Sequence, residues 1–311
     1  MEEKLLLVIL LFASVVGSFV VAACPDAGQI QPCYCHKDNG QAILICSDIP
    51  KPDVLVKVAT NSEHYRYDKV IIEESTLPYI PKAVLEKIQT KYLALRNLTL
   101  DKLIDDIPKT LDRLQYLVLQ NIDSKDLSWK VFNNTKGLKS LTIDQVPIPA
   151  ITREMTTYLT HDLEALHLRY TDTKEISTGA FEGFRLLQTL SITHNKLERI
   201  VRDSFPKPFQ VELLFLSYNK LTSIPVDLLT DMPKLKTVFL NENLISSLNE
   251  PAFETTSNIS HIDFYENPLK CDCAFKWIAV KKPLNIKGKC ATPKNLRGRE
   301  LQHLNKDDLE C

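Results

Sequence analysis

A 24-residue periodicity runs through most of the 311-residue chain and limits what it can fold into. The stretch 187–197, LQTLSITHNKL, has apolar residues at its first, fourth, sixth and eleventh places and an asparagine at its ninth. The residue at the fourth place recurs at intervals of 23 to 25 residues, as Val70, Leu93, Leu117, Leu141, Leu166, Leu190, Leu214, Val238 and Ile262. One such unit cannot bury its own apolar residues, so the spacing predicts nine copies stacked in one elongated domain.

This template is that of the leucine-rich repeat. We therefore expect an α/β solenoid, a horseshoe of about nine repeats of 23–25 residues with a parallel β-sheet on its concave face. Four aromatic residues lie nine positions before a fourth-place residue and should fill the space behind the sheet: Phe132, Phe181, Phe205 and Phe253.

The ninth place of the template divides the chain into two parts. An asparagine there satisfies backbone groups that have no partner in the sheet, and it is present only as Asn195, Asn219, Asn243 and Asn267. The first five repeats carry Ser75, Leu98, Ile122, Val146 and Thr171 instead. We therefore expect the N-terminal half to be less regular than the C-terminal half.

The N-terminal end is a candidate export signal. Residues 5–23 form an uncharged, mostly apolar run that ends in Val21-Ala22-Ala23, which predicts a cleaved signal peptide over residues 1–23 and a secreted, extracellular protein. Two alternatives remain open, since the run is also long enough for a membrane span, and its end resembles a bacterial lipoprotein cleavage box at Cys24.

All eight cysteines lie outside the repeats, in two clusters of four. They are Cys24, Cys33, Cys35 and Cys46, then Cys271, Cys273, Cys290 and Cys311. Behind an export signal these clusters predict disulfide-bonded caps, over residues 24–66 and 267–311, that close the ends of the repeats at 67–266. A four-thiolate zinc site in each cluster is the alternative, and spacing alone leaves three disulfide pairings open for each.

The cysteine clusters resemble the flanking modules of extracellular leucine-rich-repeat proteins. The N-terminal resemblance lies in Cys24-Pro25, Cys33-Tyr34-Cys35 and Cys46. The C-terminal one lies in Asn267-Pro268-Leu269-Lys270-Cys271-Asp272-Cys273, Trp277, Cys290-Ala291-Thr292-Pro293 and Cys311. It implies four disulfides, namely Cys24–Cys35, Cys33–Cys46, Cys271–Cys290 and Cys273–Cys311.

A narrower resemblance rests on the long first loop, CPDAGQIQPCYC, and the divergent early repeats. Both resemble arthropod chains of the type of the non-catalytic subunit of oplophorus-luciferin 2-monooxygenase. That resemblance implies an accessory role beside a separate enzyme and supplies no active residues.

The concave sheet is the expected binding surface, because equivalent side chains of adjacent repeats form columns there about 4.8 Å apart. The fifth-place column places Phe215 beside Phe239, and an exposed aromatic cluster is typical of a protein-binding hot spot. The predicted partner-binding residues are Leu213, Phe215, Tyr218, Phe239, His261 and Tyr265, with His167 and Arg169 toward the N-terminus. The alternative is that these aromatic rings only pack on one another.

Two further surface features follow from the sequence. Glycosylation sequons occur at Asn97, Asn133 and Asn258. From Lys270 to Arg299 nine basic residues stand against one acid, Asp272, so the C-terminal cap could contact a sulfated glycan or an anionic surface. An ordinary solvated face is the alternative.

No catalytic motif is present: the chain has eight glycines and no phosphate loop, no H-E-x-x-H and no G-x-S-x-G. We therefore expect no enzyme activity, cofactor, nucleic acid or small-molecule substrate. A metal site of His167, His194 and His261 is disfavoured because their template places differ. The favoured function is a secreted module that binds an extracellular protein or receptor in adhesion, signalling or defence. The alternative is an accessory subunit that stabilises a secreted enzyme, such as a luciferase-type monooxygenase.

Overall fold

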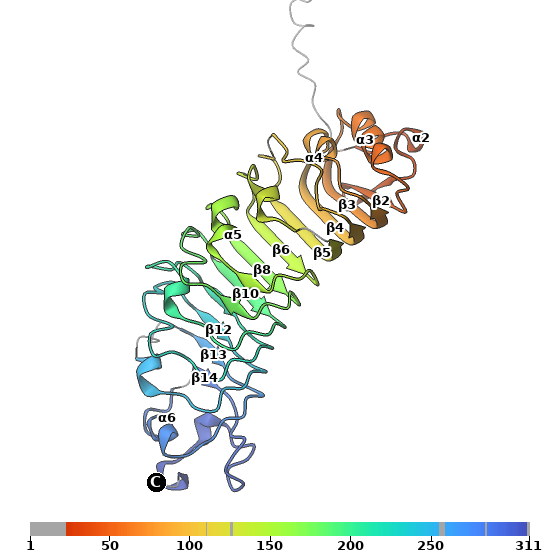
Figure 1. Ribbon diagram of the computed structural model, residues 1–311. Helices are drawn as coiled ribbons and strands as arrows, with labels where there is room; N and C mark the ends of the chain where they lie inside the picture. Colours follow the sequence, from red (N-terminus) through yellow and green to blue (C-terminus); the bar gives the residue numbers. More distant parts are fainter. Residues whose placement is uncertain (1–22, 110, 125–126, 255–258, 284, 310–311) are drawn as a thin grey trace, which may run out of the picture.

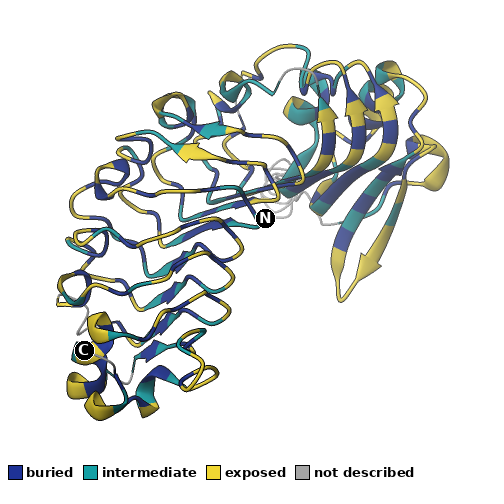
Figure 2. Ribbon diagram, turned by 60° about the horizontal axis from the view of Figure 1, so that its bottom comes forward, coloured by how far each residue is buried: buried dark blue, intermediate teal, exposed yellow. Residues whose placement is uncertain are grey.

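The repeats stack into an elongated, curved solenoid in the computed structural model, which describes residues 23–109, 111–124, 127–254, 259–283 and 285–309. The strands lie side by side along its length (Figure 1), and Figure 2 shows them on the inner side of the curve. The expected solenoid with its concave parallel sheet is confirmed. The predicted signal peptide falls, apart from Ala23, outside the described residues.

Twelve strands of the described residues form one sheet in chain order. They are β1 (Tyr34–Asp38), β2 (Gln41–Ser47), β3 (Arg66–Leu77), β4 (Gln89–Leu100), β5 (Tyr116–Ser124), β6 (Ser140–Asp144), β8 (Ala165–Arg169), β10 (Thr189–Thr193), β11 (Leu213–Phe215), β12 (Thr237–Phe239), β13 (His261–Asp263) and β14 (Ile286–Lys287). A separate pair, β7 (Ala150–Ile151) and β9 (Glu175–Ile176), lies outside this sheet. Among the strands named here, β1 pairs antiparallel with β2 and the other pairs are parallel.

The register of the sheet follows the sequence period. Each fourth-place residue is paired with the fourth-place residue of the next repeat, as Leu166 with Leu190 and Leu190 with Leu214. The column continues into both caps, because Leu44 pairs with Val70 and Ile262 pairs with Ile286.

Short helices cover the outer side. The α-helices are α2 (Ala27–Ile30), α3 (Pro52–Asn61), α4 (Lys82–Lys87), α5 (Arg153–Tyr158) and α6 (Lys276–Lys281). The 3₁₀ turns are η1 (Trp129–Phe132), η2 (Arg202–Ser204), η3 (Glu250–Phe253), η4 (Cys273–Phe275), η5 (Leu301–His303) and η6 (Lys306–Asp308). The core lies between the two layers, where the four predicted phenylalanines are all buried.

The asparagine ladder of the C-terminal half is present. The Oδ1 atom of Asn219 accepts a hydrogen bond from the amide of Leu197 at 3.2 Å. The Nδ2 atom of Asn219 donates to the carbonyls of Ile192 and Leu216, at 2.7 and 3.0 Å. Asn243 and Asn267 repeat this arrangement.

The N-terminal half, which was expected to be less regular, has longer strands of unequal length. Strands β3 and β4 each have 12 residues and β5 has nine, whereas β11, β12 and β13 have three each. At the ninth place Leu98 pairs with Ile122 in the sheet. The backbone groups there are therefore hydrogen-bonded to the neighbouring strand instead of to a side chain. Ser75 also accepts a hydrogen bond, from the amide of Ile49 at 2.9 Å.

Disulfides close both ends. Cys24 is bonded to Cys35, Cys33 to Cys46 and Cys271 to Cys290, which is the pairing implied by the flanking-module resemblance and excludes a four-thiolate zinc site. Cys273 is also disulfide-bonded, but its expected partner Cys311 lies outside the described residues. No helix in the described part of the chain has the length and apolar character needed to cross a membrane.

Candidate partner-binding surface

An aromatic cluster lies on the sheet face of β11, β12 and β13. The rings of Phe215 and Phe239 are stacked, with centroids 5.0 Å apart and planes inclined by 8°. The ring of His261 lies 5.6 Å from that of Phe239. All three side chains are half-buried, and Leu213 of the same sheet is half-buried beside Thr237. Parallel register brings these residues together because each comes from the same region of its own repeat.

Tyr218 belongs to a different aromatic group at the edge of the sheet. Its ring stacks on His194 at 4.1 Å, and His194 in turn contacts Tyr170 at 4.3 Å. All three residues occupy the eighth place and have positive φ values of 51° to 58°, which turn their side chains onto the same edge. The sequence reasoning missed Tyr170 and His194 as parts of this group. The eighth-place column, read as Tyr170, His194 and Tyr218, is the signal that could have found it.

Tyr265 is tied to the C-terminal cap. Its hydroxyl donates a hydrogen bond to Glu300 at 2.8 Å, which together with burial raises the pKa of the tyrosine. The ammonium of Lys289 lies 5.7 Å from the centre of its ring. This tyrosine therefore joins the last repeat to the cap rather than standing free at the margin of the aromatic cluster.

His167 and Arg169 lie on β8, two strands away from Phe215. Arg169 forms an ion pair with Asp144 of β6 at 2.6 Å, and Asp144 is only 4% exposed. Burial lowers the pKa of His167, and the neighbouring Arg169 lowers it further. The imidazole is therefore favoured in its neutral form, and Arg169 is held in one position by a buried carboxylate.

The other predicted sites are placed as follows. Asn97 is exposed at the eighth place, where its Nδ2 atom donates to Glu74 at 2.7 Å and its Oδ1 atom accepts from Asn121 at 2.9 Å. Asn133 is exposed at the end of η1, and Asn258 lies outside the described residues. Within the described ranges no three His, Cys, Asp or Glu side chains are grouped so as to hold a metal ion.

The basic C-terminal cap is partly neutralised by ion pairs. Of its nine basic residues, three contact a carboxylate: Lys270 with Asp272, Lys281 with Glu250 and Lys289 with Glu300, at 3.1, 2.6 and 3.4 Å. Contact of this cap with a sulfated glycan or an anionic surface stays a prediction.

Comparisons with known proteins agree with this architecture. A family profile described as "Leucine rich repeat" matches residues 161–221 and 209–269, which are the repeats with the asparagine ladder. Lumican from Homo sapiens and Lumican from Mus musculus are each 28% identical over 197 residues, which cover 62% of this chain and 54% of theirs. Lumican from Bos taurus is 26% identical over 202 residues. The chain spans about half the length of these curated relatives.

A solved structure shares the fold. A chain of the octameric complex of Latrophilin 3 (Lec, Olf), Unc5D (Ig, Ig2, TSP1) and FLRT2 (LRR) superposes with a TM-score of 0.59 and 18% identity. The match covers 89% of this chain and 93% of the other.

The repeats, the capped solenoid and these matches show a leucine-rich-repeat fold, and part of the sequence is similar to Lumican. The narrower resemblance to a luciferase subunit is not supported by the matches reported above. The disulfides at both ends are those of a protein from an oxidising, extracellular environment.

Proposed function

We propose that the protein is a secreted, non-enzymatic recognition module that binds another extracellular protein through its concave sheet. The observation that carries this proposal is the stack of Phe215 and Phe239, continued by His261, on the face of the sheet that the repeats leave uncovered. Half-buried aromatic rings held rigidly by a sheet lose little conformational freedom when a partner covers them, and hot spots are rich in such rings.

The remaining predicted residues form the surroundings of this stack. Leu213 lies beside it on the sheet, and Tyr218 stands at the sheet edge. His167 and the oriented Arg169 extend the surface toward the N-terminus and supply polar contacts. A protein interface of this kind needs an apolar centre with a polar rim, which this arrangement provides. The FLRT2 (LRR) complex, a leucine-rich-repeat protein assembled with other proteins, supports the same use of the fold.

The test starts from cross-linking mass spectrometry on the mature protein in its native extracellular fluid. Cross-links from the concave strands to a receptor or matrix protein are expected. Dominant cross-links to one enzyme chain at fixed stoichiometry would favour the accessory-subunit alternative instead.

The binding surface is then tested with the double variant Phe215→Ser, Phe239→Ser. Loss of both rings should weaken binding of the identified partner by about 2 to 4 kcal/mol, measured as its Kd, if they form a hot spot. The matched control is Leu186→Ser, Val226→Ser, since these aliphatic residues are 53% and 54% exposed outside the strands. Unchanged affinity in a folded double variant would remove the aromatic cluster from the interface.

A further inference from the structure

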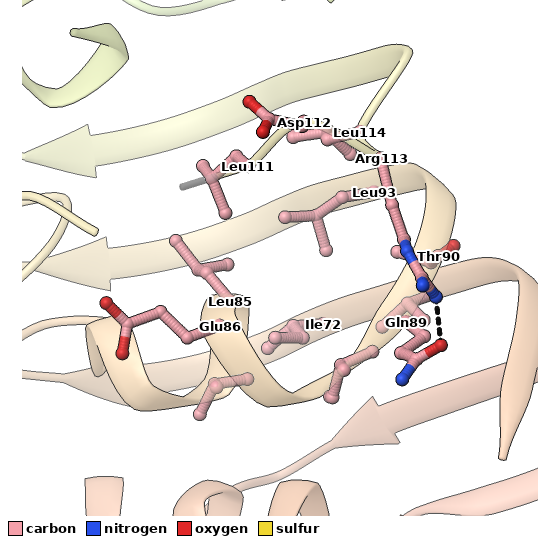
Figure 3. A pocket seen from close by; sticks show the side chains of 13 residues that line it. Ile72, Leu85, Glu86, Gln89, Thr90, Leu93, Leu111, Asp112, Arg113 and Leu114 are labelled. Carbon is pink, nitrogen blue, oxygen red and sulfur yellow. Dashed lines mark hydrogen bonds between the residues drawn. The ribbon is translucent and has the colours of Figure 1, made fainter. Parts of the chain in front are cut away.

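A cavity of about 320 Å³ lies in the N-terminal half, between the sheet and α4. It is lined by aliphatic side chains of β3, β4, α4 and the segment 111–114 and by the polar side chains of Glu86, Gln89, Thr90, Asp112 and Arg113 (Figure 3). The aliphatic lining includes Ile72, Leu85, Leu93, Leu111 and Leu114. Most protein interiors contain few voids larger than a water molecule, whereas ligand sites typically have volumes of roughly 300 to 1,000 Å³.

The loop that follows β4 is attached by two hydrogen bonds to α4, which forms one wall of the cavity. The amide of Lys82 donates to Asp105 at 2.6 Å, and the amide of Lys109 donates to Glu86 at 2.8 Å. These contacts attach the loop to the N-terminal and C-terminal ends of α4. Ile107, between them, is 38% exposed.

The mouth of the cavity is polar and offers a donor. The guanidinium of Arg113 donates a hydrogen bond to the side-chain oxygen of Gln89, which holds it across the opening (Figure 3). Glu86 already accepts the amide of Lys109, and the hydroxyl of Thr90 donates to the carbonyl of Tyr92 at 2.9 Å. An arginine has five N–H donors, so Arg113 can serve Gln89 and a ligand at once.

We propose that this cavity binds a small single-chain amphiphile, with its aliphatic chain against the leucines and a hydrogen-bond-accepting head group at Arg113. Apolar cavities exclude water and accept apolar molecules, which sets the chemistry of the tail. At about 30 Å³ for each water-sized group, the volume takes roughly ten heavy atoms, which matches a chain of medium length. The ligand is bound and not transformed, and the site is separate from the concave aromatic cluster on β11 to β13.

Isothermal titration calorimetry on the mature, disulfide-bonded protein tests the site with octanoate, 1-octanol and butyrate. Octanoate and 1-octanol should bind with one site each, and butyrate should bind at least 10-fold more weakly because it leaves most of the apolar wall uncovered. Arg113→Gln should weaken octanoate more than 1-octanol, since only the former carries a charge for the guanidinium.

Filling the cavity provides the decisive comparison. Leu85→Trp, or Ile88→Phe if the first variant does not fold, should weaken both eight-carbon probes at least 10-fold. Leu186→Trp is the matched control, because Leu186 is exposed on the outer side and far along the chain, and it should leave binding unchanged. Absence of binding of both eight-carbon probes to the wild type, or equal binding to the wild type and a folded cavity-filling variant, would overturn the proposal.

Discussion

The two halves of the solenoid satisfy the same backbone in different ways. In the C-terminal half a strand of three residues ends early, and a buried asparagine then bonds the amide and carbonyls of the turn. In the N-terminal half the strand continues, with 12 residues in β3 and in β4, and the neighbouring strand supplies the partners. The ninth-place residues Leu98 and Ile122 therefore lie inside longer strands and do not mark damaged repeats.

The junction between the halves combines both solutions. Thr171 and Thr173 follow β8, and both of their amides donate to Oδ1 of Asn195 in the next repeat, at 2.9 and 3.1 Å. The hydroxyl of Thr173 reaches back to the carbonyl of Ile148 at 2.7 Å. At the N-terminal end of the ladder, threonine hydroxyls thus occupy the place that an asparagine side chain fills in the later repeats.

The largest effect is expected from Asn219→Leu, which gives a C-terminal repeat the kind of residue found at Leu98. The short strand cannot extend to compensate, so the amide of Leu197 and the carbonyl of Ile192 lose their partner. We expect a loss of about 3 kcal/mol in the free energy of unfolding, measured by chemical denaturation, since each unsatisfied buried group costs about 1 to 3 kcal/mol.

Lys220→Ala serves as its control, because Lys220 is the exposed neighbour of Asn219. Hydrogen exchange at the amide of Leu197 gives an independent readout and should become faster in Asn219→Leu only. A stability close to that of the wild type would show that the two solutions are interchangeable, and the comparison between the halves would fail.

A smaller loss is expected from Ser75→Ala in the N-terminal half. The Ser75 hydroxyl accepts a hydrogen bond from the amide of Ile49 at 2.9 Å and donates a local one to the carbonyl of Glu73 at 2.8 Å, while the surrounding backbone remains paired between β3 and β4. We expect a loss of about 1 kcal/mol in the same denaturation measurement. A loss of unfolding free energy as large as that of Asn219→Leu would mean that pairing between the long strands does not stabilise the N-terminal half.

The smallest effect is a pH dependence that comes from β8, near the junction. The pKa of His167 is lowered in the folded protein by burial and by Arg169, from an ordinary value of about 6.5. Below that value the unfolded chain binds more protons than the folded one, so stability should fall as the pH drops through about 6.5 toward the folded pKa. The melting temperature of the His167→Gln variant should fall less steeply than that of the wild type between pH 7.5 and 5.5.

His194 contributes in the same direction, because burial lowers its pKa as well. The variant should therefore reduce the pH dependence without abolishing it. An unchanged slope in His167→Gln would show that His167 is not held in its neutral form.

The amino-acid sequence by itself determined the repeat architecture, because a period of 24 residues leaves stacking as the means to bury the recurrent leucines. It determined the register too, since equivalent places in successive repeats meet across the sheet, and it therefore placed Phe215 beside Phe239. The pairing of the described cap cysteines required the family resemblance in addition, because spacing alone allowed three pairings in each cluster.

Only the tertiary structure decided what each edge residue contacts. The backbone turns into positive φ at the eighth place, so Tyr218 stacks with His194 at the sheet edge rather than with Phe215. Tyr265 is directed to Glu300, 35 residues later in a cap of different architecture, where the repeat period gives no information. The length of the N-terminal strands and the cavity behind α4 likewise depend on contacts between neighbouring repeats, which differ in sequence although their period is the same.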